Sequence, residues 1–126
     1  KDRVRTTHWQ SEMPTRNVSF NIGEFDEFQI ADPRIPPVTV QMNSEAHRKL
    51  NAIFLRQTNP EDQVGGDVAN SLSFFTRVFG PPLFKHYYAT EIPYFHGEAF
   101  PGMIHLSWWT FQTVEDKGES EIFQAH

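Results

Sequence analysis

The sequence YFHGEAFPGMIHLSWWTF, residues 94–111, is the densest run of aromatic and apolar residues in the chain. Its first part contains the turn-forming residues Gly97, Pro101 and Gly102. From Met103 onward the side chains alternate with a period of two, which predicts a strand that continues to Phe111. Such a strand turns one of its two adjacent Trp indoles to each face, so that one lies in the core and the other lines a groove or an interface.

The composition is that of a folded domain. The chain has 126 residues, of which 38% are hydrophobic and 14% aromatic, and a domain of this size buries roughly two thirds of its unfolded surface. The net charge is −5, and the Lys and Arg residues are scattered, so we expect no nucleic-acid partner. No apolar run approaches the roughly 20 residues of a membrane span. Because Cys is absent, the chain forms no disulfide and no thiolate metal site.

Short strands are predicted upstream, over residues 17–23, 25–30 and 38–42. The first alternates polar and apolar residues, so we expect Val18, Phe20 and Ile22 to point inward. The third combines alternation with β-branched residues, which favour strands. A further strand is predicted over residues 84–92, and Pro93 ends it.

Two helices are predicted between these strands. The first covers residues 45–57, with Asn43 or Ser44 as its N-cap. The second follows the N-cap Asn59 and ends before Gly80. Its apolar residues recur at helical spacing and are Val64, Val68, Leu72, Phe75 and Phe79. Two adjacent glycines in its second turn oppose the helix, because each costs about 1 kcal/mol relative to Ala.

The order of these elements predicts an α+β fold, a mixed β-sheet with two helices packed on it. We expect residues 1–30 to be the tail of a preceding β domain. A last helix is expected to begin at Ser120 and to include His126. The chain starts at Lys1 rather than at Met, and we expect it to be part of a longer protein.

The residues alone do not specify a catalytic centre. No two His residues have the i, i+4 spacing of a helical metal site, and no Ser-His-Asp set follows from spacing. We expect surface or half-buried positions rather than metal ligation for His8, His47, His86, His96 and His105. Glu98 fits either a cleft or a solvated loop. These observations favour an α+β domain with an aromatic edge strand, without naming its function.

Several motifs, in order along the chain, resemble aminopeptidase N-like zinc metallopeptidases. Residues 17–25 are similar to the last strand of that family's N-terminal β domain. The helix that ends in Phe79, Gly80 and Pro81, and the strand at residues 88–93, also resemble family elements. Pro-Gly-Met-Ile at residues 101–104 resembles the family's P-G-L-I run. Residues 121–126 resemble the lead-in to the H-E-x-x-H zinc helix.

The resemblance implies that residues 31–126 are the N-terminal half of a thermolysin-like catalytic domain. It implies that His126 is the first zinc ligand and that the remaining ligands and the general base follow it. Catalytic zinc has three protein ligands and an open position. We therefore expect zinc in the parent protein, none bound by this fragment, and no hydrolysis by the fragment alone.

The same resemblance assigns a substrate-binding segment for peptides, namely Gly97, Glu98, Ala99, Phe100, Pro101, Gly102 and Met103. Ala99 stands where the family has the Glu that holds the substrate's free amine. Glu98 lies one residue earlier, so it can substitute only if the strand is bulged. Without a bulge, an endopeptidase-like or diverged parent is indicated. Backbone groups from Met103 to Trp108 are expected to pair with an extended peptide.

The alternative is a non-catalytic domain that binds a protein or a glycan through exposed aromatic residues. The candidates are the pairs Trp108 and Trp109, and Tyr87 and Tyr88. A truncated domain also exposes apolar surface that its missing part would cover, which favours dimerisation.

Overall fold

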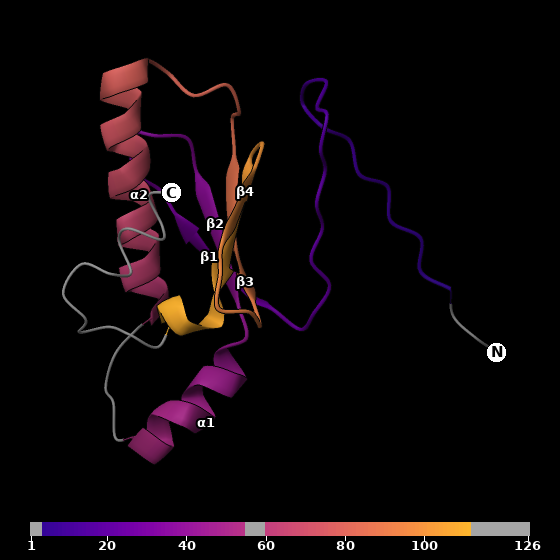
Figure 1. The fold of residues 1–126 in the computed structure, drawn as a ribbon, viewed down its shortest axis with the longest axis vertical. Helices are drawn as coiled ribbons and strands as arrows, with labels where there is room; N and C mark the ends of the chain where they lie inside the picture. Colours follow the sequence, from indigo (N-terminus) through magenta and orange to yellow (C-terminus); the bar gives the residue numbers. More distant parts are fainter. Residues whose placement is uncertain (1–3, 55–59, 112–126) are drawn as a thin grey trace.

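The computed structural model describes residues 4–54 and 60–111, which form a mixed sheet with helices (Figure 1). This confirms the predicted α+β class. The elements in chain order are β1 (Asp26–Ile30), β2 (Val38–Met42), α1 (Ser44–Phe54), α2 (Pro60–Phe79), β3 (Tyr87–Ile92), β4 (Glu98–Phe100), β5 (Met103–Ser107) and the short 3₁₀ helix η1 (Trp108–Phe111).

The sheet has the strand order β1-β2-β3-β5-β4. The three central strands β2, β3 and β5 run parallel, and each edge strand is antiparallel to its neighbour. The prediction that the strand after Pro101 forms an edge is therefore wrong, because β5 pairs with β3 on one side and β4 on the other. The exposed edge on that side is β4, which the sequence pattern did not reveal.

The predicted strand from Met103 to Phe111 is also too long. Strand β5 ends at Ser107, whose Oγ accepts a hydrogen bond from the backbone N–H of Trp109 at 3.2 Å. A side-chain acceptor at this place stabilises a helical turn, and η1 begins there. The turn directs Phe111 into the core, where it is 1% exposed.

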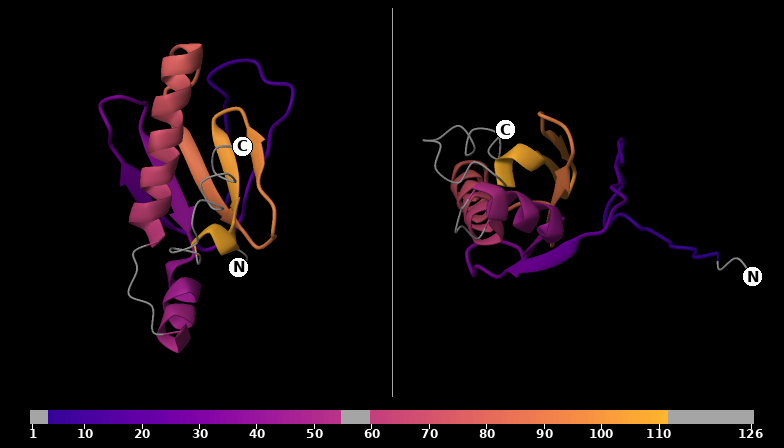
Figure 2. Two further views of the ribbon diagram at one scale, coloured as in Figure 1. Left: turned by 60° about the vertical axis from the view of Figure 1, so that its left-hand side comes forward. Right: turned by 90° about the horizontal axis from the view of Figure 1, so that it is seen from below.

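Helix α2 covers the β1–β2 side of the sheet, and α1 lies beyond the end of the sheet (Figures 1 and 2). The predicted stripe of α2 is buried only in its first half. Val64 and Val68 are each 1% exposed, whereas Phe75 and Phe79 are 37% and 80% exposed. The predicted α2 is otherwise confirmed, and Gly80 ends it with φ of 93°, a conformation that favours glycine.

The core lies between α2, the helix-facing side of the sheet and η1. Its buried apolar members are Ile35, Val38, Val40, Met42, Val64, Val68, Ala69, Ala89, Leu106 and Phe111. The structure explains why residue 65, one of the two glycines inside α2, has no side chain. A Cβ at this position would lie 2.4 Å from Ile30 Cδ1, so the absence of a side chain lets the helix approach β1 closely.

Helix α1 is attached to the sheet by a polar contact at its first turn. Asn43 caps the helix, since its Oδ1 accepts the N–H of Ala46 at 3.0 Å. The Glu91 carboxylate of β3 accepts the N–H of Asn43 at 2.9 Å and lies 3.0 Å from His47 Nε2. His47 is 2% exposed and its ring lies 5.6 Å from that of Phe111. The predicted end of this helix, residues 55–57, lies outside the described residues.

The predicted strand over residues 17–23 is wrong, and so is the direction of its side chains. The segment belongs to no strand and lies across the sheet face opposite α2 (Figures 1 and 2). Val18, Phe20 and Ile22 are 79%, 75% and 85% exposed. Their polar neighbours Ser19 and Asn21 face the sheet instead, because that sheet face offers hydrogen-bonding groups rather than apolar ones.

The predicted strand at residues 84–92 begins only at Tyr87. Asn59 and the helix predicted from Ser120 lie outside the described residues. Within residues 4–54 and 60–111, none of the helices combines the length and apolar character that crossing a bilayer requires.

Candidate functional site

The hairpin of β4 and β5 contains every residue of the predicted substrate-binding segment except Gly97, which immediately precedes it. Pro101 and Gly102 form its two-residue loop, and Gly102 has φ of 78°, as the second position of a type II turn requires. A Cβ on Gly102 would lie 3.3 Å from the Phe84 ring. A Cβ on Gly97 would lie 3.0 Å from the His105 carbonyl oxygen. Both glycines therefore allow close packing at the two ends of the hairpin.

Within residues 4–54 and 60–111, no strand pairs with the outer side of β4. Its three residues pair one to one with β5, Phe100 with Met103, Ala99 with Ile104 and Glu98 with His105. In a hairpin with a two-residue loop the closing pair exchanges both backbone hydrogen bonds, and the next pair does not. Ala99 therefore turns its N–H and C=O away from β5, toward the open edge. An extended chain can pair there.

The regular register separates the side chains of Glu98 and Ala99. Because no extra residue interrupts the pairing, neighbouring side chains lie on opposite faces. Glu98 shares the face of His105, opposite α2, and its carboxylate lies 3.7 Å from His96 Nε2. Both side chains of this contact are more than half exposed. The Glu98 carboxylate therefore lies on the opposite face of the sheet from the side chain of residue 99.

His105 occupies a polar site on the sheet face opposite α2. It is 6% exposed, its ring lies 5.2 Å from that of Phe100, and its Nε2 lies 3.4 Å from Ser19 Oγ. Burial lowers the pKa of His105, and the charge of Glu98 opposes this shift. Desolvation of the imidazolium outweighs the carboxylate because Glu98 is largely exposed to water.

Asn21 attaches the N-terminal segment to the same face. Its Nδ2 donates to Thr90 Oγ1 at 3.1 Å and to the Glu91 carbonyl oxygen at 2.6 Å. A second polar contact joins β2 to the residue before β3, where Thr39 Oγ1 lies 2.7 Å from His86 Nε2. These contacts show that the face opposite α2 is polar in its centre and partly covered by residues from the start of the chain.

An aromatic cluster lies where the β3–β4 loop meets η1. Phe95 packs against both Trp rings, with centroids 5.7 Å from Trp108 and 6.2 Å from Trp109. The two Trp rings lie 5.4 Å apart in an edge-to-face arrangement. The prediction that they occupy opposite faces of a strand is wrong, because the chain is helical there and brings them together. Phe95 is 73% and Trp109 50% exposed.

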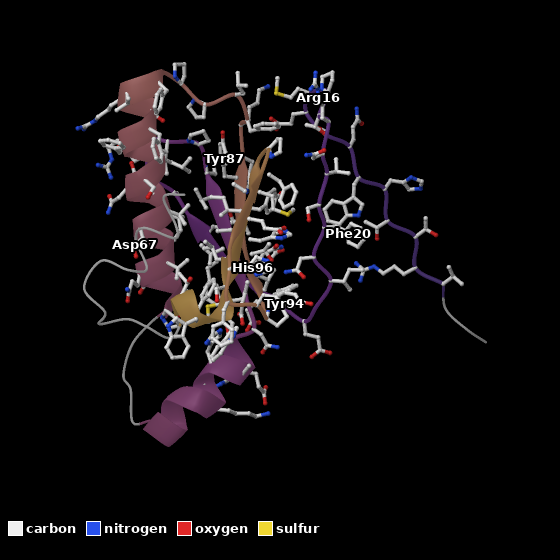
Figure 3. All side chains as sticks on the ribbon, in the orientation of Figure 1. Arg16, Phe20, Asp67, Tyr87, Tyr94 and His96 are labelled. Carbon is white, nitrogen blue, oxygen red and sulfur yellow. The ribbon has the colours of Figure 1, made fainter. Side chains whose placement is uncertain are left out.

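The other aromatic side chains of this loop extend the exposed surface. Tyr94 is 61% exposed, and its ring lies 5.5 Å from that of His96 (Figure 3). On the sheet, Tyr88 is 38% exposed and its ring lies 4.7 Å from that of His86 in a tilted arrangement, whereas Tyr87 is half-buried among the residues packed against the core. Of the predicted aromatic pairs, only Trp108 and Trp109 belong to the cluster around Phe95.

No metal centre is assembled by the described residues. Within residues 4–54 and 60–111, no three His, Asp or Glu side chains lie together as metal ligands would. The residues present here do not form a zinc site, and His126, the predicted ligand, lies outside the described residues. We therefore derive no chemical step through zinc.

Sequence reasoning missed two features of the structure, strand β4 in the site and the attachment of α1 to the sheet. Strand β4 has only three residues, too few for a period of two to be recognised. The contact between His47 Nε2 and the Glu91 carboxylate joins residues far apart in the sequence. Pro101 and Gly102 are a weak signal for β4, because they are typical hairpin residues and a hairpin needs a strand on each side.

Comparison with known proteins gives no relative, because no family model, curated protein or solved structure matches this chain.

Proposed function

We propose that this chain supplies one wall of the peptide-binding cleft of a zinc-dependent metallopeptidase, and that it does not hydrolyse peptides alone. The proposal rests on the sequence resemblance, which covers residues 17–126. The observation that supports it best is the open edge of β4, because extended substrates bind such edges by adding a strand.

Strand addition on β4 centres on Ala99. In an antiparallel ladder its N–H donates to, and its C=O accepts from, the same residue of an extended peptide, whereas in a parallel ladder the two bonds go to two different peptide residues. The Ala99 side chain is small and exposed, so it leaves room for a peptide side chain beside it. Because only one residue of β4 offers both groups, we expect weak binding that needs further contacts elsewhere in the cleft.

The unbulged register favours recognition of internal peptide segments. In the family that this chain resembles, a Glu at the position of Ala99 holds the free amine of the substrate. The carboxylate of Glu98 lies on the other face, near His96. We therefore propose an endopeptidase-like or otherwise diverged parent rather than a strict aminopeptidase. His126 remains the one proposed zinc ligand in this chain.

A second candidate function is supported by the aromatic cluster. Phe95, Trp108 and Trp109 pack against one another and two of them are at least half exposed. Exposed aromatic groups of this kind bind proteins and the apolar faces of sugars. In this case the chain is a non-catalytic binding domain, and the edge of β4 has no ligand.

The two candidates are separated by a titration followed by NMR. The probe is an acetylated and amidated hexapeptide of alternating Thr and Val residues. Under the first proposal it shifts the backbone amide signal of Ala99 and slows its hydrogen exchange. The matched control is the same peptide N-methylated at alternate residues, which cannot complete the ladder and should bind less.

Two variants at one position make the test specific. Ala99→Pro removes the outward N–H, which is not part of the β4–β5 ladder, and should abolish the shift. Ala99→Ser keeps the N–H and should bind as the unchanged chain does. If the peptide instead shifts the indole signal of Trp109, and Phe95→Ala removes that shift, the edge-strand proposal is wrong and the aromatic cluster is the binding surface.

A further inference from the structure

The segment from residue 17 to residue 22 has one occupied face and one open face. Ser19 and Asn21 are bound to the sheet, so the residues between and beside them point away from it. These are Val18, Phe20 and Ile22, all at least three quarters exposed. Figure 3 shows Phe20 on the side of the segment that faces away from the sheet. Three neighbouring apolar side chains that are exposed to water do not stabilise a monomer.

Charged residues flank these three apolar residues in the sequence. The chain bends at Arg16 and at Gly23, and Glu24 follows the second bend. Both Arg16 and Glu24 are exposed. Along the segment an exposed basic residue therefore comes first, followed by exposed Asn17, the three apolar residues and an exposed acidic residue. Residue 20 lies midway between residues 16 and 24, so the two charges are four positions from Phe20 in the sequence on either side.

This order of charged and apolar residues is complementary to the same segment of a second copy that runs in the opposite direction. When a second copy runs antiparallel and is centred on the same residue, Phe20 faces Phe20, and Val18 of each copy faces Ile22 of the other. Arg16 of each copy then lies beside Glu24 of the other. No like charges meet, and every exposed apolar side chain of the segment meets another. This is the arrangement of an isologous twofold interface, in which one surface patch serves both partners.

We propose that residues 16–24 are a self-association surface and that its partner is a second copy of this chain. The two open faces stack about a twofold axis through Phe20. The surface is small, with three apolar residues in each copy, so the dimer belongs to the weak class of interfaces. We expect a dissociation constant of roughly tens to hundreds of micromolar.

Sedimentation equilibrium of the 126-residue chain between about 10 µM and 1 mM tests this directly, since those concentrations bracket the expected constant. The unchanged chain should pass from monomer to dimer over this range. Phe20→Glu should remain monomeric, because it places two carboxylates at the twofold axis. The matched control is Phe79→Glu, which changes an equally exposed Phe on α2 and should dimerise normally. Circular dichroism checks that both variants are folded.

A charge exchange tests the register. Arg16→Glu and Glu24→Arg should each weaken the homodimer roughly fivefold to tenfold, since each creates two like-charge contacts per dimer. The double variant restores both pairs and should dimerise within about twofold of the unchanged chain. An equimolar mixture of the two single variants should also associate, because each carries the charges that the other lacks.

The mixture separates an intermolecular contact from an effect on folding, since neither variant is altered by being mixed. A chain that stays monomeric at 1 mM would overturn the proposal. A Phe20→Glu variant that still dimerises would place the interface elsewhere and overturn it equally. Failure of both the double variant and the mixture to recover would refute the antiparallel register. None of these results depends on the proposed peptide binding at β4.

Discussion

Gly65→Ala and Gly66→Ala add the same methyl group at adjacent positions of α2, and the structure predicts opposite effects on stability. A Cβ on Gly65 would lie 2.4 Å from Ile30 Cδ1 and 2.6 Å from Ile30 Cγ1. A Cβ on Gly66 would meet no atom within 4 Å. The pair therefore separates the cost of a steric clash from the gain in helix propensity.

The magnitudes follow from these two contributions. Replacing Gly by Ala inside a helix stabilises it by about 1 kcal/mol. At Gly66 this gain stands alone, so the free energy of unfolding should rise by about 1 kcal/mol. At Gly65 the contact with Cγ1 forces a change in χ1 of Ile30, a stiff β-branched side chain. Overpacking of this kind costs about 1–3 kcal/mol, so we expect a net loss of about 1 kcal/mol and a difference of about 2 kcal/mol between the variants.

Urea denaturation followed by circular dichroism measures both variants, with the unfolding slope checked for constancy. A double-mutant cycle with Ile30→Ala tests the cause, because this change removes both clashing atoms. In that background Gly65→Ala should become neutral or stabilising. Equal stabilisation by Gly65→Ala and Gly66→Ala in the unchanged background would refute the close approach of α2 to β1.

The remaining predictions concern buried polar groups and the proposed zinc ligand. Glu91→Gln should lower the free energy of unfolding by about 1–3 kcal/mol, since the carboxylate holds both His47 and the N–H of Asn43; an unchanged urea midpoint would contradict this. Burial lowers the pKa of His105 in the folded chain, so the unfolded chain binds more protons near the ordinary pKa of about 6.5. The stability contributed by neutral His105 should be complete above about pH 6.5 and be lost as the pH falls toward the folded pKa. His105→Gln should flatten this dependence between pH 7.5 and 5.5, and an identical slope in both proteins would reject the assignment. In the parent protein, His126→Ala should remove one zinc per chain by metal analysis after dialysis; retained zinc would end its proposed role as a ligand.

The strand β2 and the helix α2 show what local sequence determines in this protein. Val38–Met42 was predicted with its observed bounds, because alternation and β-branched residues act within the strand itself. Helix α2 was predicted from Pro60 to its C-terminal Gly80, because capping and helical spacing also act over a few residues. The α+β class followed from the order of such elements.

The candidate site shows the limit of this reasoning. The alternation around Phe20 was recognised, but a period of two does not say which face is buried. Hydrogen-bonding groups on β3 and β5 determine which face is buried, because they form hydrogen bonds with Ser19 and Asn21. The same applies to His105, whose burial depends on residues from the start of the chain.

The amino-acid sequence by itself determined the local elements, the acidic composition and the α+β class, because propensity, capping and periodicity are short-range properties. Tertiary structure alone decided that β5 is an interior strand, that β4 is the open edge, and that the apolar face of residues 17–22 points outward. These outcomes depend on which strands pair and which surfaces meet. Contacts between residues distant in sequence determine both, and no local pattern records them.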